Sequence, residues 1–419
     1  MAGRRVLNEK PRWFRPRGYL HFDRPVPFSF AERHVQDPQA VRQHSFWPFI
    51  TFKKTTPRYR RSERKVKPKD RPFGYAAHLD AHVYSWYAEL LSRRLEEVLS
   101  REECGASVLA YRALGKSNVH FAAEAFEDIR ETAPCTVIAF DISGFFDNLD
   151  HQLLKSAWCS LLDLDQLPPD HYNVFKSITR YASVDQPKLF REFGISPMGR
   201  RSKCERICSA AEFRTRVRAK RLIRMNPEGR GIPQGSPISA VLSNVYLLEF
   251  DRRMCALQAE VGGSYRRYSD DILWIVPPEV VATVTEKMEQ ETALVSLAIN
   301  EEKTETCDFT SDEDGELLVD RPVQYLGLTF DGTRSAIRSS TLARYYRRMK
   351  TGVHHAKRAA SRNVRDPRVY RRRLYERFTH LGHRNFVSYG RRAERITGSR
   401  TIRRQVGRHW RKLHKLLQE

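Results

Sequence analysis

Stretches of consecutive apolar residues alternate along the chain with stretches in which apolar residues recur every three or four positions. Two continuous runs, 135–141 and 272–276, are rich in Val, Ile and aromatic residues and predict buried strands. The second run follows a β-prone segment at 265–268, so the short polar stretch between them predicts the turn of a β-hairpin. Helical spacing predicts helices over 80–99, 118–130 and 279–293.

Further stretches extend this α+β pattern toward the C-terminus. A Gly- and Pro-rich loop over 229–239 opens an apolar helix that we expect to continue through Phe250. A turn over 299–305 precedes a hairpin-like apolar element at 323–330. We expect three segments: a basic, aromatic N-terminal arm at 1–60, a mixed body at 61–335 and a helical, Arg-rich C-terminal region at 336–419.

Charge is distributed unevenly over the 419 residues, whose net charge is +24. Residues 334–419 hold 26 Lys and Arg against 4 Asp and Glu, a net of +22, and residues 1–70 carry +12, which leaves −10 for 71–333. Basic ends around an acidic centre favour nucleic-acid-binding segments that flank a metal-using body. In residues 1–70, aromatic side chains alternate with Lys and Arg, a pattern that suits stacking on single-stranded nucleic acid. The alternative is that these aromatic side chains pack on the body of the protein.

Aspartates beside the two buried strands are the strongest candidates for chemistry. Asp141 ends the first strand, and Asp270 and Asp271 lie in the turn before the second. A carboxylate at the end of a buried strand is unfavourable unless a cation neutralises it, although an isolated Asp-Asp pair is more commonly a solvated turn. Three carboxylates on neighbouring strands, together with the carbonyl of Ile142, could hold two Mg²⁺ ions, with Mn²⁺ as a substitute.

Several other patterns carry less information. Asp147 and Asp150 are best explained as caps of the helix that follows them. Residues 64–72 predict a basic turn that could hold a triphosphate by charge. A Gly-Lys-Ser sequence at 115–117 is not a P-loop, because Ala110 stands where the first glycine is required.

The cysteines and the hydropathy of the chain indicate the cellular compartment of the protein. Seven irregularly spaced cysteines predict reduced thiols and no structural zinc. The N-terminus lacks the apolar core of a signal peptide, and no apolar run approaches the ~18 residues of a membrane span. We therefore expect a cytoplasmic protein. The basic span 198–224 predicts an exposed insertion near a nucleic acid.

Five features, in chain order, resemble the motifs of reverse transcriptases over about 60–332. They are Phe140 to Phe146 around the first aspartate, Gly231 to Pro237 in the Gly/Pro-rich loop, Tyr268-Ser269-Asp270-Asp271, Lys303, and Tyr325-Leu326-Gly327. The resemblance implies a right-hand polymerase, with fingers and palm at 61–335, where an antiparallel sheet packs on helices, and an α-helical basic thumb at 336–419. It implies an RNA-directed DNA polymerase that uses two metal ions and deoxynucleoside triphosphates.

The same resemblance implies a role for each matched residue. Asp141, Asp270 and Asp271 would ligate the metal ions, and Lys303 would donate a proton to pyrophosphate. Phe146 would select deoxynucleotides by clashing with a ribose 2′-hydroxyl. Contacts to the nucleotide would come from Lys67, Lys69, Arg71, Gln234 and Gly235, and contacts to primer and template from Tyr325, Leu326, Gly327, Arg371, Arg372 and Arg373.

Within the family, 75–88 and 110–118 look like motifs of the bacterial retron, abortive-infection and defence-associated groups. The nearest resemblance is to the type 2 defence-associated class, which implies a structured non-coding RNA partner copied into cDNA during phage infection. Ser269 stands where retrons usually carry alanine and leaves the subgroup open. A template-independent or protein-primed polymerase and a catalytically inactive RNA chaperone are the alternatives. Three intact aspartates argue against the chaperone. Oligomeric state is open.

Overall fold

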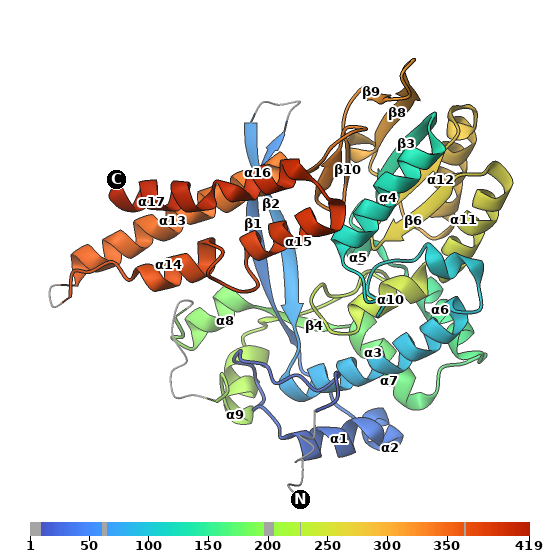
Figure 1. Cartoon of the computed structure of the whole chain (residues 1–419). Coiled ribbons are helices and arrows are strands. Elements are labelled where there is room, and N and C mark those ends of the chain that lie inside the picture. The colour runs from blue at the N-terminus through green and yellow to red at the C-terminus, as the bar shows by residue number, and fades with distance from the viewer. Residues whose placement is uncertain (1–9, 61–64, 197–204, 227, 364–365) are drawn as a thin grey trace, which may run out of the picture. The chain divides into compact units, whose positions relative to one another are not determined.

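The computed structural model describes residues 10–60, 65–196, 205–226, 228–363 and 366–419, and describes side chains in the same ranges except at 56–60, 65–67 and 69 (Figure 1). The chain forms two compact units, which we describe separately. Unit 1 comprises Met1–Arg112, Ile142–Arg253 and Glu289–Ala298, and unit 2 comprises Ala113–Asp141, Met254–Met288 and Ile299–Glu419.

The described part of unit 1 is mainly helical and contains one sheet. The sheet has the strand order β2-β1-β4-β5. Its strands are β1 (Phe49–Arg60), β2 (Lys65–Tyr75), β4 (Ala182–Asp185) and β5 (Ile223–Met225). Its helices are α1 (Phe28–Gln36), α2 (Pro38–Arg42), α3 (His78–Leu99), α5 (Phe145–Asn148), α6 (His151–Leu162), α7 (Pro169–Thr179), α8 (Gln186–Glu192), α9 (Ala210–Glu212) and α10 (Ser239–Tyr246), and α11 (Leu248–Val261) runs across the boundary with unit 2.

The predicted basic turn at 64–72 is wrong for residues 65–72, which are part of a long strand, and residue 64 lies outside the described residues. Strand β2 pairs antiparallel with β1 along its full length, from Ile50 opposite Tyr75 to Arg60 opposite Lys65, and Figure 1 shows the two as a long hairpin. This strand was not predicted because its sequence is rich in proline and charged residues. Without alternating apolar and polar residues, a sequence does not indicate a strand. Strand β1 also pairs in parallel with β4, so this sheet is mixed.

The aromatic rings near the N-terminus pack inside unit 1. Trp13 and Phe14 are 4% and 7% exposed. Their rings contact those of Phe28 on α1 and His82 on α3 at centroid distances between 4.5 and 6.2 Å. Buried rings cannot stack on nucleic acid, so the alternative expectation is confirmed for these two residues. The arm is fastened to the body by its aromatic side chains.

The basic span 198–224 was predicted to be an exposed insertion, but its described part packs against the rest of unit 1. Phe213 and Val217 are buried in the hydrophobic cluster that covers β1 and β4. Glu192 on α8 forms ion pairs with Arg216 at 3.0 Å and with Lys220 at 2.8 Å. Its basic residues at 200, 201 and 203 lie outside the described residues.

The predicted caps after the first buried strand are half right. Asp150 caps α6, where its carboxylate accepts from the backbone N–H groups of Gln152 and Leu153 at 2.8 and 2.9 Å. Asp147 lies inside α5 and caps nothing. The apolar helix predicted to run through Phe250 is divided at Leu247 into α10 and α11.

The two stretches on which the subgroup resemblance depends have structural contacts in unit 1. Asp80 is buried on α3 and accepts from His44 Nε2 at 2.8 Å and from the backbone N–H of Trp47 at 2.9 Å. Arg112 forms a two-pronged ion pair with Glu96, with both N–O distances 2.8 Å. Hydrogen bonds to charged groups of this kind help to hold the fold together.

Unit 2 contains an antiparallel five-stranded sheet in the order β6-β7-β3-β8-β9. Its strands are β6 (Ser264–Tyr268), β7 (Asp271–Val276), β3 (Cys135–Asp141), β8 (Glu305–Ser311) and β9 (Leu317–Val319). The predicted hairpin at 265–276 and the predicted strand at 135–141 are confirmed. A second, three-stranded sheet joins β10 (Val323–Tyr325), β11 (Leu328–Phe330) and β12 (Ser335–Ile337), and confirms the hairpin-like element at 323–330.

One hydrophobic core connects these two sheets with helices of the same unit. Alternate residues of β3 and β7, such as Val137 and Ile275, face buried residues of α4 (Asn118–Thr132), β10–β12, α15 (Phe386–Thr397) and α16 (Arg400–Gly407). The predicted helix at 279–293 is α12 (Val281–Leu294). The remaining C-terminal helices, α13 (Ser339–Arg362), α14 (Arg371–Phe378) and α17 (His409–Gln418), share a second apolar cluster.

The C-terminal region is helical, as expected. Each of its helices presents a narrow apolar stripe, and arginines occupy the other faces. In the part of the chain that the structure describes, no helix has both the length and the apolar character needed to cross a membrane.

Candidate active site

Asp141 and Asp271 face each other across two central strands of unit 2. Asp141 is the last residue of β3 and Asp271 the first of β7, and they are register partners in the antiparallel pair. The register begins with Thr136 opposite Val276, so five pairs of mostly apolar residues bring the two carboxylates to the same end of the sheet. Because side chains opposite each other share a face, both acids lie on one face of the sheet.

The third aspartate lies in the tight turn beside this pair. Tyr268 and Asp271 close the β6–β7 hairpin, which leaves Ser269 and Asp270 as a two-residue loop. Ser269 has φ of 64° and is 4% exposed. Two-residue hairpin loops require a positive φ at the first central residue in their favoured forms, so Ser269 accepts some backbone strain. The short loop keeps Asp270 next to Asp271.

The electrostatic environment of Asp271 disfavours its negative charge. Enclosure by surrounding protein atoms raises the pKa of Asp271 to about 6, and the nearby carboxylates of Asp270 and Asp141 raise it further in the same direction. Lys303 and Arg338 act in the opposite direction. The side chain is nevertheless open to solvent along part of its surface. The site therefore combines accumulated negative charge with access from outside.

Lys303 provides a positive charge at this site. Its Nζ forms an ion pair with Asp141 Oδ2, and the two side chains are 23% and 25% exposed. A 3-10 helix, Glu301–Lys303, presents the lysine, and the backbone N–H of Asn300 donates to the carbonyl of Asp141 at 2.7 Å. Sequence analysis placed Lys303 near the nucleotide, and the structure brings it to the first aspartate.

The carboxylates of Asp141, Asp270 and Asp271 are suitable ligands for a hard divalent cation. Carboxylate oxygens are the ligands that Mg²⁺ prefers, and the neighbouring acids carry more negative charge than Lys303 and Arg338 offset. Among the described residues, no group of three or more His, Cys, Asp or Glu side chains is already arranged to hold a metal ion. Ile142, whose carbonyl was the predicted extra ligand, follows Asp141 directly and has a buried side chain.

The predicted primer contact is a tight turn within the same unit. Tyr325 ends β10, and Leu326 and Gly327 have φ of 44° and 90° before β11 begins. Asn118 at the start of α4 donates its side-chain amide to the carbonyl of Leu326 at 2.9 Å. The backbone N–H of Arg338 donates to the carbonyl of Gly327 at 3.2 Å. Asn118 belongs to the motif-like stretch 110–118 but was not predicted as a site residue, and Arg338 had no sequence signal.

Tyr325 is an unusual member of this turn. Its ring is 4% exposed, and its buried hydroxyl has no hydrogen-bond partner among the described residues. Burial raises the pKa of this hydroxyl, and so does the negative charge of Asp271 nearby. The predicted primer contact therefore lies within the electrostatic influence of Asp271.

The predicted nucleotide contacts belong to unit 1, where several of them meet. The backbone carbonyl of Gln234 accepts from the N–H of Gly74 at 2.8 Å, and the N–H of Ile232 donates to the carbonyl of Phe146 at 2.9 Å. Gly235 has φ of 106°, and a Cβ there would approach the carbonyl oxygen of Gly74 to 2.7 Å. The loop at 231–235 therefore joins the end of β2 to α5.

The basic side chains of the β1–β2 hairpin are only partly described. Arg71 is exposed and stands opposite Lys54 in the register. Lys67 and Lys69 lie on β2, and their side chains lie outside the described residues. Phe146 is partly exposed, and its ring centroid is 5.2 Å from that of buried Phe145. Arg371, Arg372 and Arg373 form the exposed first turn of α14 in unit 2.

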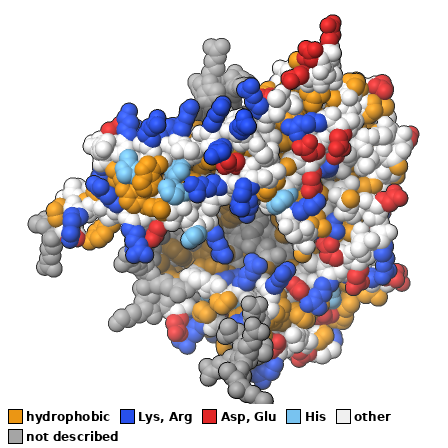
Figure 2. Space-filling model, viewed as in Figure 1, with side chains coloured by type: hydrophobic (Ala, Val, Ile, Leu, Met, Phe, Trp, Pro, Cys, Tyr) orange, Lys and Arg blue, Asp and Glu red, His pale blue; other side chains and the backbone are white. Residues whose placement is uncertain are grey.

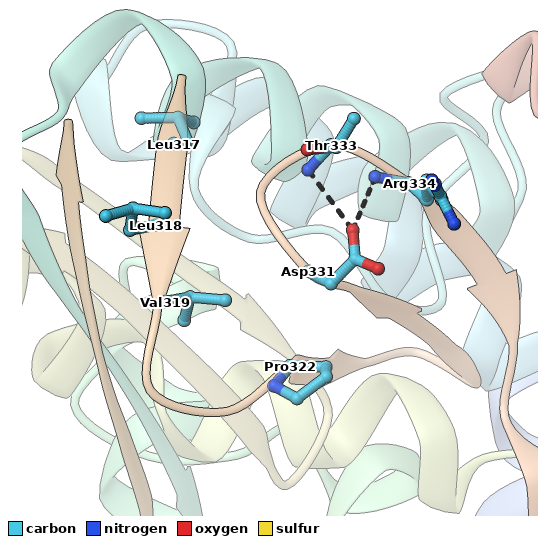
Figure 3. A pocket seen from close by; sticks show the side chains of 7 residues that line it. All are labelled: Leu317, Leu318, Val319, Pro322, Asp331, Thr333 and Arg334. Carbon is cyan, nitrogen blue, oxygen red and sulfur yellow. Dashed lines mark hydrogen bonds between the residues drawn. The ribbon is translucent and has the colours of Figure 1, made fainter. Parts of the chain in front are cut away.

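A surface cavity of about 360 Å³ lies elsewhere in unit 2 (Figure 3). It is lined by β9, by Pro322 and by the turn between β11 and β12, where Asp331 accepts from the backbone N–H groups of Thr333 and Arg334 at 3.2 and 2.6 Å. None of the predicted site residues lines it.

Comparison with known proteins finds one family match. The family model described as "Reverse transcriptase (RNA-dependent DNA polymerase)" matches residues 179–330. The fold is therefore that of a reverse-transcriptase-like polymerase, with mixed helices and antiparallel sheets. More particularly, the chain carries a reverse transcriptase domain. The match includes Gln234, Asp270, Asp271, Lys303 and Tyr325, and Asp141 lies ahead of it.

Solved structures with a detectable likeness are distant. Apo telomerase from Candida tropicalis, truncated from its C-terminal domain, is 11% identical, with 74% of this chain and 60% of that chain covered and a TM-score of 0.45. Candida albicans telomerase in complex with the TWJ fragment of telomeric RNA is 11% identical, with 93% and 64% covered and a TM-score of 0.42. The Sicinivirus 3Dpol RNA-dependent RNA polymerase is 13% identical, with 77% and 59% covered and a TM-score of 0.40.

The chain spans about three fifths of the length of the telomerase chains that it matches first. No curated protein sequence matches it.

Proposed function

We propose that this protein copies a structured non-coding RNA into cDNA by nucleotidyl transfer and acts in the cytoplasm of a bacterium as part of antiphage defence. The observation that carries the polymerase activity is the facing pair Asp141 and Asp271, with Asp270 in the adjoining turn. This pair belongs to a chain with a matched reverse transcriptase domain. The bacterial defence role, with retrons and abortive-infection enzymes as relatives, rests on the sequence resemblance.

In this proposal Asp141, Asp270, Asp271 and the carbonyl of Ile142 hold two Mg²⁺ ions, or Mn²⁺ in their place. When bound, such ions lower the pKa of a primer 3′-hydroxyl and neutralise charge on the departing pyrophosphate. Lys303 offsets the charge of Asp141 before the ions arrive and then donates a proton to pyrophosphate. The ion pair between Lys303 and Asp141 supports the first of these two roles.

Nucleotide selection is proposed for residues of unit 1. Arg71, with Lys67 and Lys69 on the same strand, attracts the triphosphate of an incoming deoxynucleotide. Phe146 excludes a ribose 2′-hydroxyl by its bulk. The loop with Gln234 and Gly235 lies against the nascent base pair, and the backbone conformation that Gly235 provides keeps side-chain bulk out of this contact.

RNA and primer are proposed to contact unit 2. Tyr325, Leu326 and Gly327 position the primer, and Arg371, Arg372 and Arg373 hold phosphates of the RNA. The net charge of +22 over 334–419 supports the RNA contact. The proposed domains are the arm at 1–60, fingers and palm at 61–335 and a thumb at 336–419.

A primer-extension assay tests the activity. Purified protein is offered a primed RNA template, a primed DNA template and primer alone, with Mg²⁺ and the four deoxynucleoside triphosphates. We expect extension that depends on the RNA and whose sequence complements it. Extension of primer alone would instead indicate a template-independent polymerase, and a product covalently attached to protein would indicate protein priming. Absence of DNA synthesis on any RNA would end the proposal.

The RNA partner and the defence role need separate experiments. Sequencing of the nucleic acid that co-purifies with the protein should return one enriched, structured RNA and its complementary DNA. Plaque counts on bacteria that express the protein and that RNA should fall relative to bacteria that express Asp271→Asn. Equal plaque counts would remove the defence role and leave the polymerase activity standing.

A further inference from the structure

Four aromatic side chains of unit 2, from α14, α17 and the turn that follows α14, form a continuous ring cluster. The centre is Trp410 on α17, whose ring centroid is 4.6 Å from that of His414, 5.3 Å from that of His380 and 5.5 Å from that of Tyr375. The Tyr375 and Trp410 rings are stacked, with 18° between their planes. We call these four residues the ring platform.

The ring platform is partly open to solvent, because His380 and Trp410 are exposed and Tyr375 and His414 are half-buried. Trp410 is 38% exposed, and the neighbouring Leu381 is 55% exposed. Figure 2 shows orange apolar surface bordered by pale blue histidines and blue Lys and Arg side chains over α14 and α17. A tryptophan in a core would bury its ring against aliphatic side chains, whereas Trp410 stacks on other rings and leaves part of its surface uncovered.

Positive charge surrounds the rings. Arg371 and Arg372 are exposed one helical turn before Tyr375 on α14, and Arg411 is exposed next to Trp410. The C-terminal segment that contains them carries a net charge of +22. Aromatic rings set among cations are the arrangement on which single-stranded nucleic acid stacks its bases while its phosphates contact the cations. The charge therefore selects a polyanion with unpaired bases as the occupant.

The histidines favour RNA over DNA. His409 is buried, and its Nδ1 donates to the carbonyl of Val406 at 2.6 Å, so its Nε2 is an acceptor. His380 Nδ1 lies 3.1 Å from that Nε2 and must donate to it. When the His380 ring carries only this proton, its Nε2 is an acceptor, and the ring lies 5.3 Å from that of Trp410, centroid to centroid. A ribose 2′-hydroxyl can donate to such an acceptor, and deoxyribose cannot.

We propose that the ring platform binds an unpaired base of single-stranded RNA, at a site distinct from the aspartates. This inference rests on the proposed function in taking RNA as the partner. Trp410 supplies the stacking face, and His380 contacts the sugar. The platform would hold a single-stranded part of the RNA while another part is copied.

Binding measurements on the whole protein test this inference. Trp410→Ala should weaken binding to a single-stranded RNA by about 5- to 150-fold, the range for losing one base–aromatic stack. It should leave the salt dependence of binding unchanged, because stacking releases no counterions. Trp410→Phe should bind within about 3-fold of the unaltered protein. Tyr370→Ala is the matched control, since Tyr370 is 67% exposed in the same segment and its hydroxyl bonds Asp366 at 2.6 Å.

Two results would overturn the inference. One is equal loss of affinity for single-stranded RNA and for blunt RNA duplex in Trp410→Ala, since a duplex offers no unpaired base to a flat ring surface. The other is a dimer of the unaltered protein that Trp410→Ala dissociates, which would make the platform an interface with a second copy. Analytical ultracentrifugation of the unaltered protein and of Trp410→Ala measures the oligomeric state.

A cross-linking experiment uses the unaltered protein and does not depend on how the variants fold. RNA that contains 4-thiouridine is irradiated with the protein, and cross-linked peptides are identified by mass spectrometry. We expect peptides from α14 or α17 that contain Tyr375 or Trp410, and cross-links confined to other elements would exclude the platform. Failure of the proposed function would appear separately, as absence of DNA synthesis by the unaltered protein.

Discussion

Lys303 and Asp141 form an ion pair although they lie 162 positions apart in the chain. The pair connects the last residue of β3 to the 3-10 helix that precedes β8, next to the carboxylate of Asp271. A positive charge at this place lowers the electrostatic cost of collecting three acids. The relationship leads to the first two predictions.

Substitution of Asp271 by Asn should abolish DNA synthesis and leave RNA affinity within about 2-fold. It should also raise the free energy of unfolding in a chelating buffer, because it removes a charge that Asp270 and Asp141 repel. The gain should not exceed about 1 kcal/mol, since solvent screens a side chain this exposed. Primer extension and urea unfolding measure the two effects. A large loss of stability would mean that the carboxylate is structural.

Substitution of Lys303 by Met should lower kcat for nucleotide addition by at least about 10-fold, with a smaller effect on KM, if the lysine donates a proton in the transition state. Lys303→Arg keeps the charge and the pairing with Asp141 and should recover part of the rate. Single-turnover kinetics on an RNA template measures the rate. An unchanged kcat in Lys303→Met would restrict the residue to holding Asp141.

Substitution of Phe146 by Ala should increase the incorporation of ribonucleotides relative to deoxynucleotides by about 10- to 100-fold, because the clash with the 2′-hydroxyl is removed. Phe146→Tyr retains the bulk and is the control. The measurement is the ratio of kcat/KM values for the two kinds of triphosphate. An unaltered ratio in Phe146→Ala would show that partly exposed Phe146 only packs against Phe145.

Substitution of Gly235 by Ala should lower the free energy of unfolding by about 1–3 kcal/mol and raise KM for nucleotide. The backbone φ of 106° is unfavourable for alanine, and the new Cβ would press against the Gly74 carbonyl at 2.7 Å. Gly229→Ala is the matched control, because its φ is 66° and no atom lies within 4 Å of the added carbon. Urea unfolding that is the same for both variants would contradict the close approach.

Replacement of Arg371, Arg372 and Arg373 by Gln should weaken RNA binding and flatten its dependence on salt. Each lost phosphate contact should reduce the slope of log K against log salt by about 0.7 for single-stranded RNA. Arg93→Gln, a 63% exposed arginine on α3, is the control and should change neither quantity. A triple variant with an unchanged slope would place the RNA path elsewhere.

The sequence by itself determined the local elements of this protein. Continuous apolar runs at 135–141 and 272–276 and helical spacing over 80–99 predicted structures that depend on side chains close together in the chain. The hairpin around Asp270 and Asp271 was predictable for the same reason. The reverse transcriptase domain was recognisable because its motifs are short and lie in order along the chain.

Tertiary structure alone decided which of these elements meet. The register that sets Asp141 opposite Asp271 depends on packing on both faces of the sheet, and a shift by one residue would separate the acids. The long β1–β2 hairpin, the burial of Trp13 and the rings gathered around Trp410 likewise depend on partners distant in sequence. A local sequence pattern gives the spacing of apolar residues along the chain. It does not show which distant residues those side chains will pack against.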